Sequence, residues 1–380
     1  LKNNILLLIL GGFLLVLFFI FVPSTLFPIS VDFRGNLWEP AYLLVHRMNP
    51  YYIEGNFDNL NPLWFPMIIG LFFPLGYLPL QWASNIWFAF SCIVLFLIVV
   101  IMARPSHKPV SYVMLTIIAL ALFPSSVGHF KYGQVSFFIS LLFLILSLYR
   151  KQLSPFFTGL LLSLCFTKPQ IAVLFLPAFL AVYFSEQGKE RFLRMFLSTI
   201  LWGVIFCIPL FIAYPNWIPT FISNLQTNPL WAYPSLYYLL VLTLGFDTPV
   251  FVLAGLYLLI GIGVAVFLTY KLEKFEALLW SMALTPLFSP VIWSNDFVLM
   301  YPLLLLVVFD ERSKRGSWVA IVGYIACAIL IISMKNSGYI DDHYVVWVPV
   351  FLNAVLALSY QIRRRKINQD LKSVSDSLIA

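Results

Sequence analysis

Apolar segments long enough to cross a lipid bilayer recur along almost the whole chain, and they constrain its fold more than any other feature. A spanning helix needs about 20 predominantly apolar residues. Clear candidates are 5–22, 82–103, 109–126, 135–149, 195–213, 249–270, 317–333 and 344–361. Shorter or proline-interrupted candidates are 155–167, 169–184, 277–290 and 297–309. Charged residues make up only 10% of the chain, against about 25% in soluble domains. The sequence therefore predicts an all-α polytopic membrane protein with about 12 crossings.

Two further apolar stretches, 64–80 and 236–246, are interrupted by Pro, Gly or aromatic residues, and we interpret them as partial or interfacial segments. Residues 1–361 are predicted to form one transmembrane domain, and 362–380 a basic cytoplasmic tail. Because all four cysteines lie inside apolar runs, we expect buried thiols rather than disulfides or metal ligands. They are Cys92, Cys165, Cys207 and Cys327.

The distribution of basic residues indicates the orientation in the membrane. With the N-terminus in the cytoplasm, 18 of the 23 Lys and Arg residues fall on the cytoplasmic side, as the positive-inside rule requires. An even number of crossings also places the "RRRK" tail inside. We therefore expect a multi-pass plasma-membrane protein with both termini cytoplasmic. The polar loop 23–63 is then the first extracytoplasmic loop.

The first loop contains a predicted amphipathic helix. Pro40 suits the first helical position, and the run to Met48 ends before Asn49-Pro50. His46 and Arg47 point away from its apolar stripe, so we expect the helix to lie on the membrane surface with Asp32 held at the lipid–water boundary. The stripe comprises Ala41, Leu44, Val45 and Met48.

Further polar clusters fall on the same predicted outer side. They are "GHFKYGQVSF" with His129, Lys131 and Gln134, "CFTKPQ" with Lys168, "SPVIWSNDF" with Trp293, Asn295 and Asp296, and "GYIDDHYVVW". Lys168 is the most informative, because a Lys inside an apolar run costs about 2.5–3.5 kcal/mol on insertion scales. A phosphate group is a natural partner for such a compact cation. The alternative is a Lys that extends its ammonium group to the interface.

Each of the other polar residues also has a plain structural interpretation. Asp32 is also consistent with a solvated loop residue, and His129 with Lys131 is consistent with ordinary loop chemistry. Gln134 follows a Gly at the start of a helix and could cap it. Asp296 could mark a helix start. Three neighbours in one loop, Asp341-Asp342-His343, cannot easily face one ion, so we predict no metal site.

These clusters, in this order, resemble glycosyltransferase family 87, the polyprenyl-phosphate-sugar-dependent mannosyltransferases and relatives with the GT-C membrane fold. The matching pieces are Asp32 with a downstream "NPYY", "NPLWFPMIIGLFFPLGYLP", "YGQVSF", "FTKPQ" and "LFSPVIW". The family continues after the last piece with an acidic residue and His, where this chain reads Ser294-Asn295-Asp296.

The resemblance implies a GT-C-type fold, Asp32 as the catalytic base and Lys168 near the lipid phosphate of the donor, with mannose as the family's usual sugar. Lys131, His129 and Arg34 are the further candidates for phosphate binding. Candidates for binding the substrate are Gln134, His46, Arg47, Tyr52, Trp293, Asn295 and Asp296.

The residues are consistent with this chemistry independently. Sugar transfer from a lipid phosphate needs one carboxylate to take the acceptor proton and one cation to stabilise the leaving phosphate. It needs no cytosolic nucleotide, and the chain has no phosphate-binding glycine loop. We expect a polyprenyl-phosphate-sugar donor, a glycolipid, glycan or protein acceptor, surrounding membrane lipids, no nucleic acid and no cofactor, with metal dependence left open.

Two other classes remain as alternatives at this stage. A transporter or lipid flippase would place polar residues at the bilayer midplane and would usually show repeated halves. A non-catalytic membrane scaffold would not depend on Asp32. The glycosyltransferase interpretation predicts that Asp32 and Lys168 face one outer cavity, whereas a transporter would have its cavity in the middle of the membrane.

Overall fold

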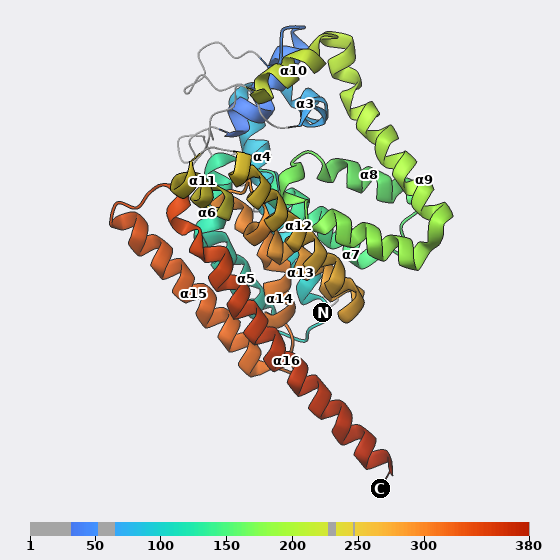
Figure 1. Cartoon of the computed structure of the whole chain (residues 1–380), viewed down its shortest axis with the longest axis vertical. Coiled ribbons are helices and arrows are strands. Elements are labelled where there is room, and N and C mark those ends of the chain that lie inside the picture. Colours follow the sequence, from blue (N-terminus) through green and yellow to red (C-terminus); the bar gives the residue numbers. More distant parts are fainter. Residues whose placement is uncertain (1–31, 52–64, 227–232, 246–247, 380) are drawn as a thin grey trace. The chain divides into compact units, whose positions relative to one another are not determined.

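A computed structural model describes residues 32–51, 65–226, 233–245 and 248–379. The regular elements in this part of the chain are helices (Figure 1). They divide into two compact units, here called unit 1 and unit 2. Unit 1 comprises Leu1–Phe96, Val127–Ala172 and Phe179–Trp231, and unit 2 comprises Leu97–Ser126, Val173–Ala178 and Ala232–Ala380. The predicted first crossing, 5–22, lies outside the described residues.

Unit 1 begins with a π-helical turn, η2 (Phe33–Trp38), that continues into α2 (Glu39–Val45). The unit continues through α3 (Pro66–Phe72), η3 (Phe73–Tyr77), most of α4 (Leu80–Ala103), most of α6 (Pro124–Tyr132), α7 (Ser136–Tyr149), α8 (Pro155–Cys165), η4 (Pro169–Ile171), most of α9 (Phe175–Ala213) and α10 (Trp217–Gln226). Its core near the N-terminal end is formed by Phe33, Leu37, Ala41 and Leu44, which are fully buried at helical spacing.

The helix predicted in the first loop is present but shorter, ending at Val45. Ala41 and Leu44 pack against η3 inside the protein rather than facing lipid, and Met48 is 43% exposed. Gly76 makes this packing possible, because a Cβ there would lie 2.5 Å from the carbonyl oxygen of Ala41. The buried part of the stripe therefore packs inside unit 1, and the predicted position of the helix on the membrane surface stays a prediction.

Unit 2 is a bundle of helices from the C-terminal half together with α5 (Val110–Leu122). Its further elements are α11 (Leu236–Leu244), α12 (Thr248–Lys271), α13 (Lys274–Phe288), η5 (Ser294–Met300), α14 (Tyr301–Val308), α15 (Lys314–Asn336), η6 (Asp342–Val345) and α16 (Trp347–Ile379). The helices α15 and α16 lie side by side (Figure 1). Apolar side chains on α12 such as Leu256, Leu259 and Phe267 are exposed, as expected of a surface that faces lipid.

The membrane-spanning segments are confirmed in part. Within the described residues, five helices are long and apolar enough to cross a membrane: those at Leu80–Ala103, Phe175–Ala213, Pro249–Lys271, Lys314–Asn336 and Asp342–Lys366. The pair α5 and α6, bent by 65°, would make a sixth. The expected 12 crossings are not confirmed. The chain is nevertheless a multi-pass membrane protein by the length and composition of these helices.

The two predicted segments 169–184 and 195–213 share one long element, α9. Gly188 divides it, because its φ of 76° and ψ of 173° are not helical. Figure 1 shows α9 as two arms that meet at a bend. A positive φ of this kind favours glycine. The bend at Gly188 therefore separates the helical part of segment 169–184 from segment 195–213.

Candidate active site

Three polar side chains from distant parts of the sequence meet in unit 1. Gln134 donates a hydrogen bond from Nε2 to Oδ2 of Asp32. Lys168 donates from Nζ to Oε1 of Gln134 at 2.9 Å and to Oγ of Ser136 at 3.4 Å. Gln134 and Lys168 are 3% and 1% exposed. The structure therefore brings together the carboxylate and the ammonium group that the sequence singled out.

The turn that carries Gln134 is fixed by its glycine and by a tryptophan. α6 ends at Tyr132, and Gly133 has a φ of 66°, the left-handed conformation common just after a helix. The backbone N–H groups of Gly133 and Gln134 both bond to the carbonyl of His129. Trp87 Nε1 donates to the Gly133 carbonyl at 2.9 Å. The turn is therefore held from two sides, and Gln134 projects from a fixed backbone.

Lys168 lies in the turn after α8, where proline constrains the backbone. Pro169 disfavours the helical conformation for the preceding residue, and Lys168 has a φ of −138° and a ψ of 74°. Thr167 donates from Oγ1 to the Leu164 carbonyl at 2.8 Å and closes the end of the helix. A buried ammonium group needs polar partners, and Gln134 and Ser136 provide two of them.

Asp32 directly precedes the π-helical turn, whose buried face fixes its position. Phe33 is fully buried and its ring stacks on Trp87 at 6.2 Å between centroids. Trp87 also meets Phe72 edge-on at 5.0 Å. The same tryptophan therefore supports both the Asp32 segment and the Gly133 turn. No pattern in the sequence singles out Trp87, whereas Ser136 lies in the "YGQVSF" piece and could have been found there.

His129 is fully buried beside this group. Its Nε2 accepts a hydrogen bond from the backbone N–H of Phe137 at 3.1 Å, which joins α6 to α7. Nε2 is then unprotonated and the neutral ring carries its proton on Nδ1, an atom that has no hydrogen-bond partner among the described residues. His129 thus has a structural contact, and its predicted contact with phosphate stays a prediction.

The other predicted residues of unit 1 lie in separate environments. Arg34 pairs with Glu39 at 3.4 Å, and Lys131 is exposed with its Nζ 5.4 Å from the centre of the Tyr132 ring. His46 and Arg47 are exposed just after α2, where Arg47 has a φ of 56°. Tyr52 lies outside the described residues.

Trp293, Asn295 and Asp296 belong to unit 2, where they help to build the start of η5. Asp296 Oδ2 accepts a hydrogen bond from the Trp293 N–H at 3.1 Å. Asp342 Oδ1 accepts from Ser294 Oγ at 2.9 Å. The helix-start interpretation of Asp296 fits this geometry. In the described part of the chain, no group of three or more His, Cys, Asp or Glu residues is placed to hold a metal ion.

A cavity of about 630 Å³ opens beside α2 in unit 1. Its wall includes Trp38, Tyr42 and His46, whose rings follow one another with centroids 5.0 and 4.2 Å apart. Residues 76–80 form the opposite wall, and Trp38 Nε1 donates to the Leu78 carbonyl at 2.9 Å. The volume lies in the range of small-molecule sites, about 300–1,000 Å³.

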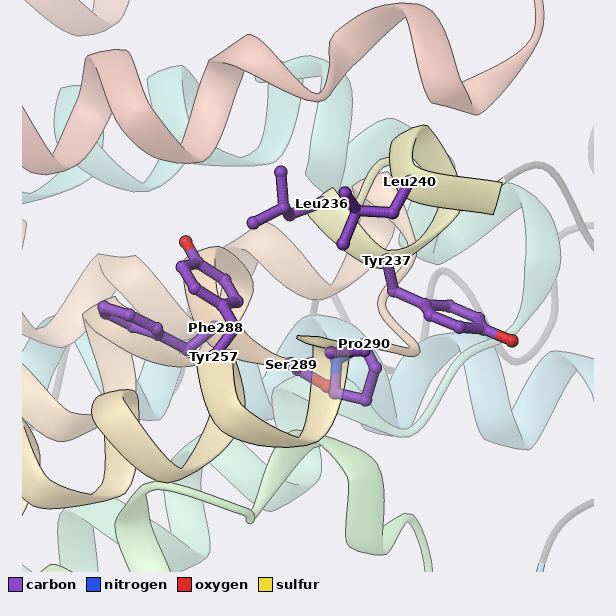
Figure 2. A pocket seen from close by; sticks show the side chains of 8 residues that line it. Leu236, Tyr237, Leu240, Tyr257, Phe288, Ser289 and Pro290 are labelled. Atoms are coloured by element: carbon purple, nitrogen blue, oxygen red, sulfur yellow. The ribbon is translucent and has the colours of Figure 1, made fainter. Parts of the chain in front are cut away.

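A crevice in unit 2 has a different character. It lies between α11, α12 and the end of α13, and it has no space for a water molecule. Figure 2 shows the rings of Tyr257 and Phe288 close together, with centroids 4.7 Å apart, while Tyr237 points away from them. This crevice is lined mainly by apolar and aromatic side chains and contains none of the polar residues singled out from the sequence.

The described part of the chain is a helical membrane protein in which a part-buried carboxylate and a buried ammonium group are both hydrogen-bonded to one buried carboxamide. The sequence model of glycosyltransferase family 87 matches residues 65–290, more than half of the chain. The chain belongs to glycosyltransferase family 87, and is a membrane glycosyltransferase. The matched region contains Gln134 and Lys168, whereas Asp32 and Trp293 lie outside it. No match is found among curated proteins.

Proposed function

We propose that this protein transfers a sugar, mannose by the family's usual chemistry, from a polyprenyl-phosphate donor to a hydroxyl group of an extracytoplasmic acceptor. The observation that carries the proposal is the convergence of Asp32 and Lys168 on the two ends of Gln134. One group can take up a proton and the other can bind a phosphate. The positive-inside distribution of Lys and Arg supports an extracytoplasmic site, because it places the Asp32, Gln134 and Lys168 loops outside.

The reaction requires one bond to form and one to break. The acceptor oxygen attacks the anomeric carbon of the donor, its proton passes to the Asp32 carboxylate, and the bond from that carbon to the phosphate oxygen breaks. Polyprenyl phosphate leaves with the electron pair. Attack opposite the leaving group inverts the anomeric centre. General-base catalysis of this kind contributes about 10²–10⁴-fold to the rate.

Lys168 acts on the leaving group in this proposal. Negative charge develops on the phosphate as the bond breaks, and a cation already in place stabilises it without reorganisation. Lys168 is 1% exposed, and its ammonium group is held by Gln134 and Ser136. A water-poor setting strengthens its attraction for a phosphate.

The cavity beside α2 is suited to the acceptor. Its aromatic wall of Trp38, Tyr42 and His46 offers apolar ring surface with polar atoms at the edges, a combination that suits the apolar faces and hydroxyl groups of sugar rings. Asp32 precedes the same continuous helical segment. Asp32 lies six positions before Trp38 on this segment, so the proposal places the acceptor site and the base on one element.

The deciding experiment is Asp32→Asn, assayed as transfer from a synthetic polyprenyl-phosphate mannose in purified membranes. We expect turnover to fall by about 10²–10⁴-fold, with unchanged expression and elution in detergent. Asp341→Asn, which removes an exposed carboxylate in unit 2, is the matched control and should keep full activity. Wild-type turnover by Asp32→Asn would refute the assignment of the base.

A further inference from the structure

Gln134 has a geometry that a residue contacting substrate would not need. Its side chain is almost completely buried, and both ends of its carboxamide are hydrogen-bonded, one to Asp32 and the other to Lys168. The sequence suggested either a helix cap or a substrate contact for this residue. Neither interpretation explains a carboxamide that lies between a carboxylate and an ammonium group.

The orientation of this carboxamide follows from the chemistry of its neighbours. An ammonium group can only donate hydrogen bonds, and an ionised carboxylate can only accept them. The carbonyl end must therefore face Lys168 and the NH₂ end must face Asp32, as the structure has it. Reversing the amide would break both hydrogen bonds. The arrangement thus favours an ionised Asp32 and a charged Lys168 together.

We propose that Gln134 is a positioning residue, which orients the Asp32 carboxylate to accept a proton and orients the Lys168 ammonium group that would bind the donor phosphate. The inference rests on the proposed function and deepens it. The carboxamide donates a hydrogen bond to Asp32 and accepts one from Lys168, so it orients both groups without adding a charge of its own.

Among the described residues, η2, α2 and α6 carry few charged or titratable side chains besides Asp32. The charged or titratable side chains on these elements, besides Asp32 and Lys168, are the buried ring of His129 and exposed Lys131 on α6, and the Arg34–Glu39 pair on η2 and α2. None of these is altered by a substitution at Gln134. Gln134 is hydrogen-bonded to Asp32 and Lys168, so a change in the pH dependence of a Gln134 variant is expected to act through these two groups.

The test is Gln134→Glu, which keeps the size of the side chain but turns the NH₂ group facing Asp32 into a carboxylate oxygen. Two carboxylates in contact cannot both ionise easily, so protonation of the pair moves to higher pH. We expect the acidic limb of the pH profile of kcat/KM to shift upward by at least about one pH unit. Gln152→Glu, at an exposed site between α7 and α8, is the matched control and should leave the profile unchanged.

Gln134→Leu separates positioning from simple packing. It keeps the bulk and loses both hydrogen bonds, so we expect kcat to fall by roughly ten-fold or more, the loss of about 1.4 kcal/mol, and the donor KM to rise. A packing role alone would predict wild-type kcat and donor KM for Gln134→Leu and an unshifted acidic limb for Gln134→Glu. Those two results together would overturn the proposal.

The outcomes distinguish this inference from the proposed function. If Asp32→Asn is inactive but the pH profile of Gln134→Glu is not shifted, the assignment of Asp32 as the base stands and the positioning role of Gln134 is refuted. Full activity of Asp32→Asn would remove both. Where Gln134→Glu does not fold, Gln134→Asn is assayed instead, because the shorter carboxamide cannot reach both partners. A kcat at least roughly ten-fold lower supports the inference, and wild-type kcat overturns it.

Discussion

Asp310→Asn tests whether a buried ion cluster stabilises unit 2. Arg363 on α16 donates to Glu276 on α13 at 2.6 Å and to Asp310 in the turn between α14 and α15. Arg312 adds a second cation at 3.0 Å from Asp310. The side chains of Arg363 and Asp310 are 7% and 5% exposed. The cluster therefore links α13, α16 and the turn between α14 and α15, with Arg363 and Asp310 largely away from solvent.

The size of the effect follows from the ionisation of Asp310. Burial alone would raise the pKa of this carboxyl, but hydrogen bonds from Arg312 and Arg363 lower it from 3.8 to about 2. A difference of roughly two pH units between folded and unfolded chain corresponds to about 2.5 kcal/mol of stability. Because the folded pKa is the lower one, this contribution is complete above pH 4 and is lost as the pH falls to about 2.

The assay is thermal unfolding in detergent, followed by intrinsic tryptophan fluorescence at pH 7 and at pH 2.5. Asp310→Asn should lower the Tm at pH 7 by several degrees, and the difference from wild type should shrink at pH 2.5. Asp341→Asn, at an exposed carboxylate, is the control that should change neither value. Equal Tm values for wild type and Asp310→Asn at pH 7, or a difference that stays the same at pH 2.5, would refute the reasoning.

Two further predictions concern the substrates. Lys168→Ala should raise the donor KM by roughly 10- to 150-fold, since hydrogen bonds to charged groups contribute about 1.5–3 kcal/mol. The acceptor KM should stay near the wild-type value. Lys335→Ala, at an exposed lysine, is the control. An unchanged donor KM would contradict the phosphate role. Tyr42→Ala should raise the acceptor KM by roughly 2- to 10-fold. Tyr42→Phe keeps the aromatic ring and should keep most of the affinity for the acceptor. A rise in the donor KM alone for Tyr42→Ala would place the acceptor site elsewhere.

Hydrophobic patterns predicted the positions of the helices well. The run 82–103 became α4 (Leu80–Ala103), and 317–333 became α15 (Lys314–Asn336). The number of crossings could not be predicted in the same way. α8 has 11 residues, which at helical rise span about 16 Å, against about 30 Å for the hydrocarbon core. Composition shows that such a helix is apolar, but not whether it crosses.

The site was predictable to the extent that burial of charge is costly. Lys168 stood out because an ammonium group in an apolar run needs partners, and the structure supplies Gln134 and Ser136. The role of Gln134 could not be predicted, because a carboxamide carries no charge and is common at helix ends. Trp87 could not be singled out either, since an aromatic residue in an apolar helix resembles every other core residue.

The position of Asp32 relative to the matched region bears on how the site is assembled. Gln134 and Lys168 lie within the region that matches the family, and Asp32 lies before it. The hydrogen bond from Gln134 joins the base to that region, and Trp87 holds both segments through Phe33 and Gly133. A carboxylate carried on the first loop can therefore be placed to within a hydrogen bond by residues about 50 and 100 positions later. The base is positioned by the packing of unit 1, so substitutions at Trp87 should disturb it as much as substitutions near Asp32.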